Sequence, residues 1–162
     1  MRVLCCLDGT NVEQMKRATA MLSGSEPITL GLIYVIDTGA RHDIEHTRER
    51  FLRPHGSPPS RQHEMDEAER ASAKETLDEG SHCFSGAETL QRQGTPEREI
   101  VNAAVEWQAD LVIVCPRGEY GGTPRVGPKS IGHTARFVLD HAPCPVLLMR
   151  PPNQGPFPRQ FR

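Results

Sequence analysis

The chain has 162 residues, the length of one ordinary domain, and carries a formal net charge of -2. A dedicated nucleic-acid binder shows an excess of Lys and Arg, so this near balance argues against nucleic acid as a partner. Aromatic residues make up 5% and charged residues 25% of the chain. This composition predicts a solvated globular domain with an aliphatic core.

The apolar runs of the chain are short. None approaches the roughly 18 residues that cross a bilayer, and the first, Val3–Leu7, meets Asp8 at once, unlike a secretory signal peptide. The chain has 5 cysteines and no C-x-x-C pair, which is typical of reduced thiols. Cys5 and Cys6 are neighbours on a predicted strand, so they are expected to point to opposite faces as small buried residues. We expect a cytoplasmic protein with no membrane partner.

The first elements alternate strand, helix and strand. Val3–Leu7 is a continuous apolar run, typical of a strand buried on both faces of a parallel sheet. Thr10-Asn11-Val12-Glu13 resembles a capping box and predicts a helix that ends at Gly24. The apolar, β-branched segment Ile28–Ile36 predicts the second strand. Together these segments form a βαβ unit.

The middle of the chain is more polar. Residues 38–63 are irregular, with a Ser57-Pro58-Pro59-Ser60 stretch, and predict an excursion over the surface. Residues Glu64–Glu79 are rich in Ala, Glu and Lys and predict a helix ended by Gly80. Ala87–Gln91 predicts a short third strand.

The last third of the chain again alternates helices with strands. Thr95-Pro96-Glu97 predicts a helix start, and Leu111–Cys115 is the clearest buried strand of the sequence. The loop 116–131 is rich in Gly and Pro. A helix is expected from about Gly132 to His141, and Pro145–Met149 predicts the fifth strand.

Five strands that alternate with four helices predict an α/β fold with a three-layer, doubly wound parallel sheet. We expect one domain over residues 1–150, with a variable surface excursion at about 38–63, followed by a Pro-rich C-terminal tail over 151–162. In such sheets ligands bind beyond the carboxyl ends of the strands, where the winding direction reverses.

Four segments carry a resemblance to the universal stress protein family over nearly the whole chain. They are Val3–Thr10, Ile33–Asp37, Ala109–Val114 and His141–Arg150, and the last is the most specific. The resemblance implies a Rossmann-like sheet with strand order 3-2-1-4-5 and an adenine-nucleotide cleft between the first and fourth strands. It also implies a homodimer through the C-terminal strand.

The resemblance implies a role for each residue of the cleft. Asp8 would lie beside the adenosine, Val35 would line the base, and glycines near a helix N-terminus would let the backbone approach phosphate. The ligand would be ATP or AMP, with Mg²⁺ if ATP. The implied cofactor-binding residues are Cys6, Leu7, Asp8, Val35, Val114, Cys115, Arg117, Gly118, Gly132, His133 and Thr134.

The phosphate loop departs from the family pattern, which is G-x-x-G, nine residues, then Gly and Ser or Thr. Cys115 stands at the first Gly, Gly118 at the second, and about four extra residues precede Gly132. His133 then stands where the family has a hydroxyl, and would replace it as a hydrogen-bond donor.

Two groups of residues in the expected cleft have a structural interpretation as well as a ligand-binding one. Asp8, followed by Gly9 and Thr10, would either contact adenosine or simply organise the turn into the first helix. The glycines at 118, 121 and 122 would either wrap phosphate or serve as turn residues.

Residues 122–130 nearly match a P-loop, G-x-x-x-x-G-K-S/T. Pro128 removes a backbone donor at the critical place, so the match is not a P-loop. We keep Arg117, Arg125 and Lys129 as candidates to bind an anion. The default interpretation is that they are charged side chains exposed to solvent.

Residues His42–His46 match H-x-x-E-H, the inverted zinc-peptidase arrangement. The match lies in the irregular excursion and has no evident third ligand, so we interpret it as accidental and expect no metal site.

Three functions follow from these observations. The first is a binding or signalling domain switched by an adenine nucleotide, the second a dimeric regulatory module without nucleotide, and the third a slow ATP hydrolase in which Asp8 helps to hold a metal. No convincing general base is evident, so the enzyme is the weakest of the three. The apolar run Val146–Met149 would need cover as an edge strand, which supports dimerisation.

Overall fold

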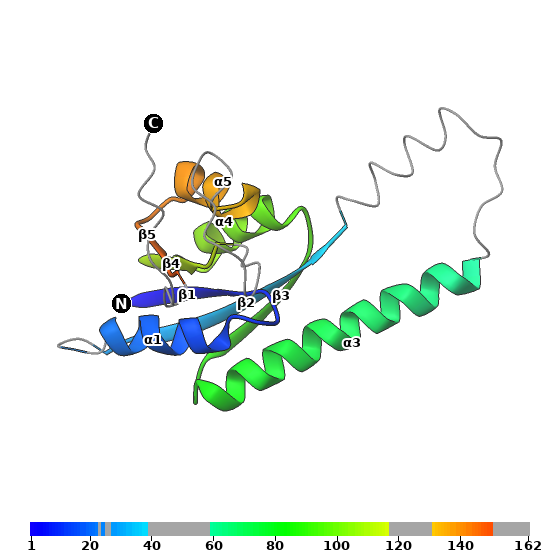
Figure 1. The fold of residues 1–162 in the computed structure, drawn as a ribbon, viewed down its shortest axis with the longest axis horizontal. Helices are drawn as coiled ribbons and strands as arrows, with labels where there is room; N and C mark the ends of the chain where they lie inside the picture. The colour runs from blue at the N-terminus through cyan, green and yellow to red at the C-terminus, as the bar shows by residue number, and fades with distance from the viewer. Residues whose placement is uncertain (23, 25–26, 39–58, 117–130, 151–162) are drawn as a thin grey trace, which may run out of the picture.

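A computed structural model describes residues 1–22, 24, 27–38, 59–116 and 131–150. Its centre is a sheet of five parallel strands in the order β3-β2-β1-β4-β5 (Figure 1). The strands are β1 (Arg2–Leu7), β2 (Thr29–Asp37), β3 (Glu88–Gly94), β4 (Leu111–Val114) and β5 (Val146–Leu148). The fold class and the strand order predicted above are therefore confirmed.

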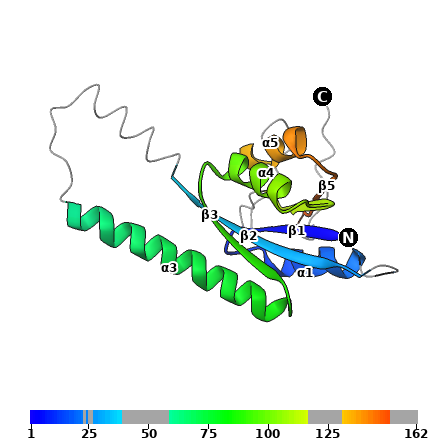
Figure 2. The ribbon, with the colours of Figure 1, turned by 180° about the vertical axis from the view of Figure 1, so that it is seen from behind.

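In the described part of the chain, four helices cover the two faces of this sheet. One face carries α1 (Val12–Leu22) and α3 (Pro59–Cys83), and the other carries α4 (Pro96–Glu106) and α5 (His133–His141) (Figures 1 and 2). α3 extends beyond the sheet at its N-terminal end (Figure 2). The arrangement has three layers, as a doubly wound fold requires.

The central strand β1 is buried on both sides. Val3, Cys5 and Leu7 pack in the core under α1 and α3. Leu4 and Cys6 pack in the core under α4 and α5. The two neighbouring cysteines thus point to opposite faces, as the alternation along a strand predicts.

Strand β2 lies unusually close to the residue that ends α4. Trp107 packs its ring on Gly31, and a Cβ built at Gly31 would lie 2.9 Å from the ring. Trp107 Nε1 also donates a hydrogen bond of 2.9 Å to Glu88 Oε2, so the indole links β2 to β3. A glycine is required at position 31 because any side chain there would overlap the ring.

Several element boundaries differ from the predictions. α3 runs from Pro59 to Cys83, so residues 59–63 of the expected excursion are helical and Gly80 does not end the helix. Gly80 instead lies where Leu7 and Leu32 press on α3, since a Cβ there would be 2.9 Å from Leu7 Cδ1.

β3 extends beyond the predicted Gln91 to Gly94, because its pairing with β2 continues as far as Asp37. α1 begins at Val12, so Asn11 rather than the predicted Thr10 holds the position before the helix. β4 ends at Val114 and β5 spans Val146–Leu148, each slightly shorter than predicted.

Candidate functional site at the carboxyl ends of β1 and β4

The turn after β1 is organised by Asp8. Its Oδ1 accepts hydrogen bonds from Thr10 N at 2.9 Å and from Thr10 Oγ1 at 2.7 Å. Gly9 between them has φ of 86°, a conformation that glycine adopts without strain. These bonds form an Asx turn, which is the structural one of the two roles considered for Asp8. Asp8 is exposed, so its carboxylate also faces the solvent at this edge.

Asn11 ties the same turn to the end of β1. Its side chain is buried, its Oδ1 accepts from Asp8 N at 3.1 Å, and its Nδ2 donates to Cys6 O at 2.8 Å. The amide therefore satisfies one donor and one acceptor of the strand end, where the sheet ladder stops. Sequence reasoning missed Asn11 as a site residue. The available signal was a helix-capping residue type directly before the first helix.

Cys115 lies at the same level, directly after the end of the neighbouring strand β4. The pairing of Cys5 with Ile113 places Leu7 and Cys115, each two residues further on, next to each other. Burial raises the pKa of the Cys115 thiol to about 11, a hydrogen bond with Asn11 acts in the lowering direction, and Asp8 raises it. The raised pKa favours the neutral thiol at pH 7, so Cys115 is not an activated nucleophile and adds no negative charge at this edge of the sheet.

The other predicted strand residues are divided between the two cores. Cys6 and Val114 are buried, and Val35 is half-buried, on the α4 and α5 face. Leu7 is buried in the core cluster on the opposite face, and Cys115 packs against that same cluster. Burial leaves mainly the backbone groups of Cys6, Leu7 and Val114 to meet a ligand.

The N-terminus of α5 starts from a residue that must be glycine. Gly132 has φ of 80° and ψ of 165°, a region that is essentially restricted to glycine. His133 follows, is largely exposed, and places Nε2 3.1 Å from Glu97 Oε1 on α4. Thr134 is half-buried. Glu97 on α4 is therefore a protein partner of His133. The predicted role of His133 as a donor to a ligand stays a prediction.

Arg117 and Gly118 lie outside the described residues, and so do the P-loop-like segment 122–130 and the H-x-x-E-H match at 42–46. Within the described part of the chain, no group of three or more His, Cys, Asp or Glu side chains is arranged to hold a metal ion.

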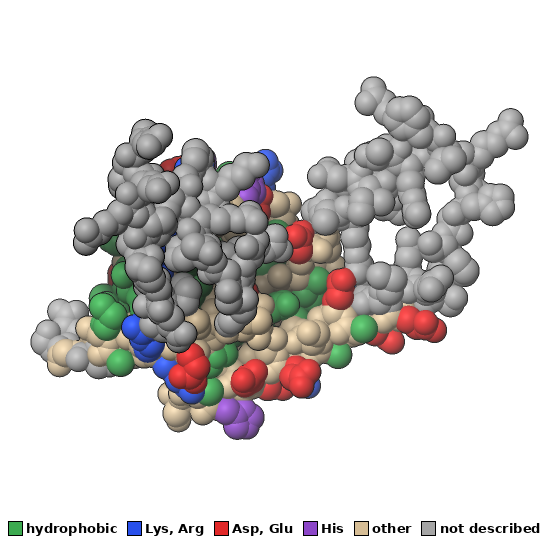
Figure 3. Space-filling model, in the orientation of Figure 1, with side chains coloured by type: hydrophobic (Ala, Val, Ile, Leu, Met, Phe, Trp, Pro, Cys, Tyr) green, Lys and Arg blue, Asp and Glu red, His purple; other side chains and the backbone are tan. Residues whose placement is uncertain are grey.

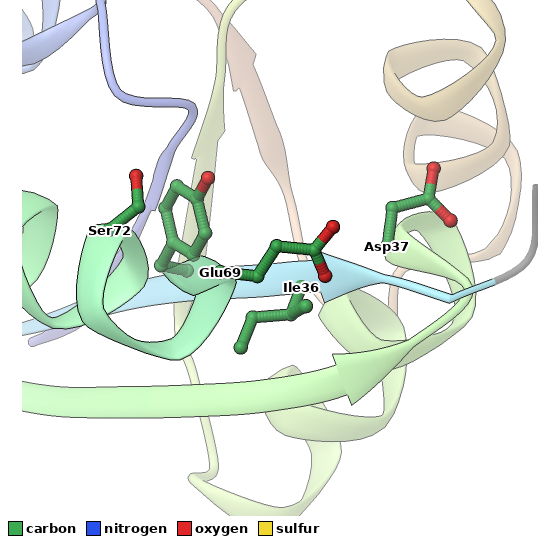
Figure 4. Close-up of a pocket in the computed structure, with 5 residues that line it drawn as sticks. Ile36, Asp37, Glu69 and Ser72 are labelled. Atoms are coloured by element: carbon green, nitrogen blue, oxygen red, sulfur yellow. The ribbon is translucent and has the colours of Figure 1, made fainter. Parts of the chain in front are cut away.

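A cavity of about 190 Å³ lies beside this site, between the carboxyl end of β2 and α3. Ile36 and Asp37 come from β2, and Glu69 and Ser72 come from α3 (Figure 4). Tyr34 of β2 completes the lining. Sequence reasoning did not anticipate this cavity, because it depends on how α3 lies across β2.

The strand order and the helices on both faces of the sheet define a doubly wound α/β protein. The model of the universal stress protein family matches residues 1–150. The chain belongs to the universal stress protein family. Among the described residues, no helix is long and apolar enough to span a membrane.

A curated relative supports this membership in sequence. It is a universal stress protein from Thermus aquaticus, encoded in the 3′ region of a sulfhydrylase gene, and it is 38% identical over 63 residues. The match covers 39% of this chain and 43% of the relative, so the aligned part spans less than half of either protein.

Several solved structures share the fold. The universal stress protein UspA from Lactobacillus plantarum has a TM-score of 0.62 at 21% identity, with 93% of this chain and 97% of that chain covered. A universal stress protein in complex with cAMP has a TM-score of 0.56 at 17% identity, with 93% and 96% covered. A family member from Arabidopsis thaliana with AMP bound has a TM-score of 0.56 at 14% identity, with 93% and 91% covered.

Proposed function

We infer that this protein is a binding or signalling domain that takes an adenine nucleotide at the carboxyl ends of β1 and β4. The observation that carries the proposal is the topology. β2 and β3 lie on one side of β1, and β4 and β5 lie on the other, so the winding reverses between β1 and β4. Loops diverge at such a point and leave a crevice for a ligand.

The local chemistry supports a phosphate-bearing ligand. The proposed cleft would lie between the turn at Gly9, which leads into α1, and Gly132, which leads into α5. Helix N-termini offer unpaired N–H donors and a favourable dipole to an anion. Arg117, Gly118, His133 and Thr134 complete the proposed phosphate side.

The adenosine side rests on Asp8 and Val35. Asp8 Oδ1 is engaged by Thr10, but a carboxylate has about four acceptor positions, so Asp8 can hold the turn and contact adenosine at once. The related structures in complex with cAMP and with AMP support adenine nucleotides as the class of ligand.

ATP and AMP are both proposed ligands, and Mg²⁺ would accompany ATP. Because the described residues offer no cluster of metal ligands, phosphate oxygens and water would hold most of the ion. The protein would contribute Asp8 at most. We propose binding without turnover, since no described group in the cleft is placed as a general base.

Calorimetric titration with ATP, AMP and cyclic AMP, with and without Mg²⁺, tests the proposal. We expect saturable binding by the natural chain, weakened in Asp8→Ala and retained in Asp78→Ala, which removes an exposed carboxylate of α3. Absence of heat and of any thermal shift at millimolar nucleotide would favour a dimeric module without nucleotide. Slow phosphate release that disappears in Asp8→Ala would favour a hydrolase.

We also propose a homodimer through β5. This strand lies at the edge of the sheet, and Val146, Leu147 and Leu148 are only half-buried in the single chain. An apolar edge with unpaired backbone groups is a favourable place for a second copy. Sedimentation should give a dimer at micromolar concentration, and Leu147→Lys should shift it to a monomer. A monomer of the natural chain would overturn this part of the proposal.

A further inference from the structure

The cavity between β2 and α3 has the chemistry of a second binding site. It is bordered by a phenol, an aliphatic side chain, a hydroxyl and two carboxylates, from Tyr34, Ile36, Ser72, Asp37 and Glu69. Figure 4 shows Glu69 extending from α3 toward Asp37, with Ile36 beneath it on β2. α3 packs directly on β2, so the two walls are held against each other.

The size of the cavity limits the ligand. Its volume of about 190 Å³ lies below the roughly 300–1,000 Å³ of pockets that hold drug-sized molecules. The cavity is also partly open to solvent, so it would not enclose a complete nucleotide but could hold a molecule of a few heavy atoms. The cavity and the proposed nucleotide cleft are thus expected to take different ligands.

The charge of the lining favours a cation. Asp37 and Glu69 are the acidic side chains among the five described lining residues, and none of the five is basic. Each already has an interaction within the chain, and the several acceptor positions of a carboxylate allow additional donors. An ammonium group would form charge-assisted hydrogen bonds with them.

The surface around the cavity also carries mainly acidic side chains. Figure 3 shows acidic side chains gathered along α3. The exposed ones are Glu64, Glu67, Glu75, Asp78 and Glu79, against Arg70 and Lys74 as exposed cations on the described part of this helix. The excess of carboxylates would raise the local concentration of a cationic ligand.

The apolar part of the lining favours an organic cation over a metal ion. Tyr34 provides an aromatic ring that can attract an ammonium group, and Ile36 is a buried aliphatic contact for methylene groups. A divalent ion would use oxygen ligands alone, and no set of three or more metal-ligating acidic, His or Cys side chains occurs in the described residues.

We propose that the cavity formed by Tyr34, Ile36, Asp37, Glu69 and Ser72 binds a small aliphatic amine. One ammonium group lies between Asp37 and Glu69, and the methylene chain lies against Ile36 and Tyr34. The ligand class follows from the size, the charge and the mixed lining of the cavity, and it does not depend on nucleotide binding.

The test is a calorimetric titration with 1,4-diaminobutane at low ionic strength, with 1,4-butanediol as the neutral molecule of matching length. The natural chain should bind the diamine saturably and should not bind the diol. Glu69→Gln should weaken diamine binding about tenfold or more, since it removes one charged acceptor. Glu75→Gln removes the same charge from an exposed position of α3 outside the cavity, and should change the affinity by less than about twofold.

Three results would overturn the proposal. Equal weakening in Glu69→Gln and Glu75→Gln would mean a diffuse attraction to α3. Competition by Mg²⁺ at equal concentration would mean a metal site. No saturable response to the diamine would mean no site. Circular dichroism confirms that both variants fold, and unchanged AMP titrations would separate a failure here from a failure of the nucleotide proposal.

Discussion

The guanidinium of Arg2 lies 4.1 Å from the centre of the Trp107 ring, and Arg2 Nε donates a hydrogen bond of 2.8 Å to Trp107 O. A cation over an indole face is attracted by the ring, so the contact adds to the hydrogen bond. Arg2 and Asp110 also exchange two bonds, from Arg2 N to Asp110 Oδ2 and from Asp110 N to Arg2 O. This cluster fixes the amino ends of β1 and β4, at the opposite end of these strands from the candidate site. Stability and ligand binding can therefore be probed at separate places.

Replacing Trp107 should destabilise the fold without touching the cleft. Trp107→Ala removes a ring that is 7% exposed and should lower the free energy of unfolding by about 3–5 kcal/mol. Trp107→Phe keeps part of the ring but loses the bond to Glu88, and should cost less. Urea denaturation measures both changes. A loss of less than about 1 kcal/mol in Trp107→Ala would contradict the role assigned to the indole.

A methyl group at position 31 should be costly because of Trp107. Gly31→Ala places a Cβ 2.9 Å from the ring, and overpacking of this kind costs about 1–3 kcal/mol. The matched control is Gly24→Ala, where a Cβ would meet nothing within 4 Å. The cost of Gly31→Ala should fall in a Trp107→Phe background, since the atoms that overlap belong to the second ring of the indole. Additive effects in the double variant would contradict this explanation.

Replacing Asn11 should lower both the stability of the fold and the affinity for nucleotide. Asn11→Ala leaves Cys6 O and Asp8 N without their partner, and should lower the free energy of unfolding by about 1–3 kcal/mol. Because the turn of Asp8 then loses one anchor, nucleotide binding should weaken together with stability. Denaturation and calorimetry on the same protein measure both. Thr19→Ala, on the same helix but away from this turn, serves as the control for calorimetry and should leave the nucleotide affinity unchanged.

Alkaline pH should destabilise the protein through its buried thiols. Burial raises the pKa of Cys5 to about 12 and that of Cys115 to about 11, from 9.0. The folded state therefore keeps protons that the unfolded state releases above pH 9. This contribution to stability is complete below about pH 9 and is lost as the pH rises through the folded values, toward 11 and 12. Denaturation midpoints between pH 8 and pH 11 measure the decline, and Cys5→Ala should flatten it. If the stability of Cys5→Ala declined equally with pH, the effect would come from other groups.

The predictable parts of the fold are the strands with continuous apolar runs. β1 and β4 were predicted to within about one residue, because both faces of these strands are covered and demand apolar side chains. β3 was predicted too short, since its sequence is mostly polar and only its pairing with β2 shows how far it extends. α3 was also predicted too short, because its apolar residues form a weak stripe.

By itself, the sequence determined the alternation of strands and helices, the family, and the positions of Asp8, Cys115 and Gly132 at strand and helix ends. These are local properties, since apolar runs, glycines and turn residues act on their chain neighbours. Only the tertiary structure decided that Arg2 meets Trp107, that Asn11 joins Asp8 to Cys6 and Cys115, and that α3 and β2 form the walls of a partly open cavity. Contacts between residues far apart in sequence depend on how helices cross the sheet, which the local pattern does not specify.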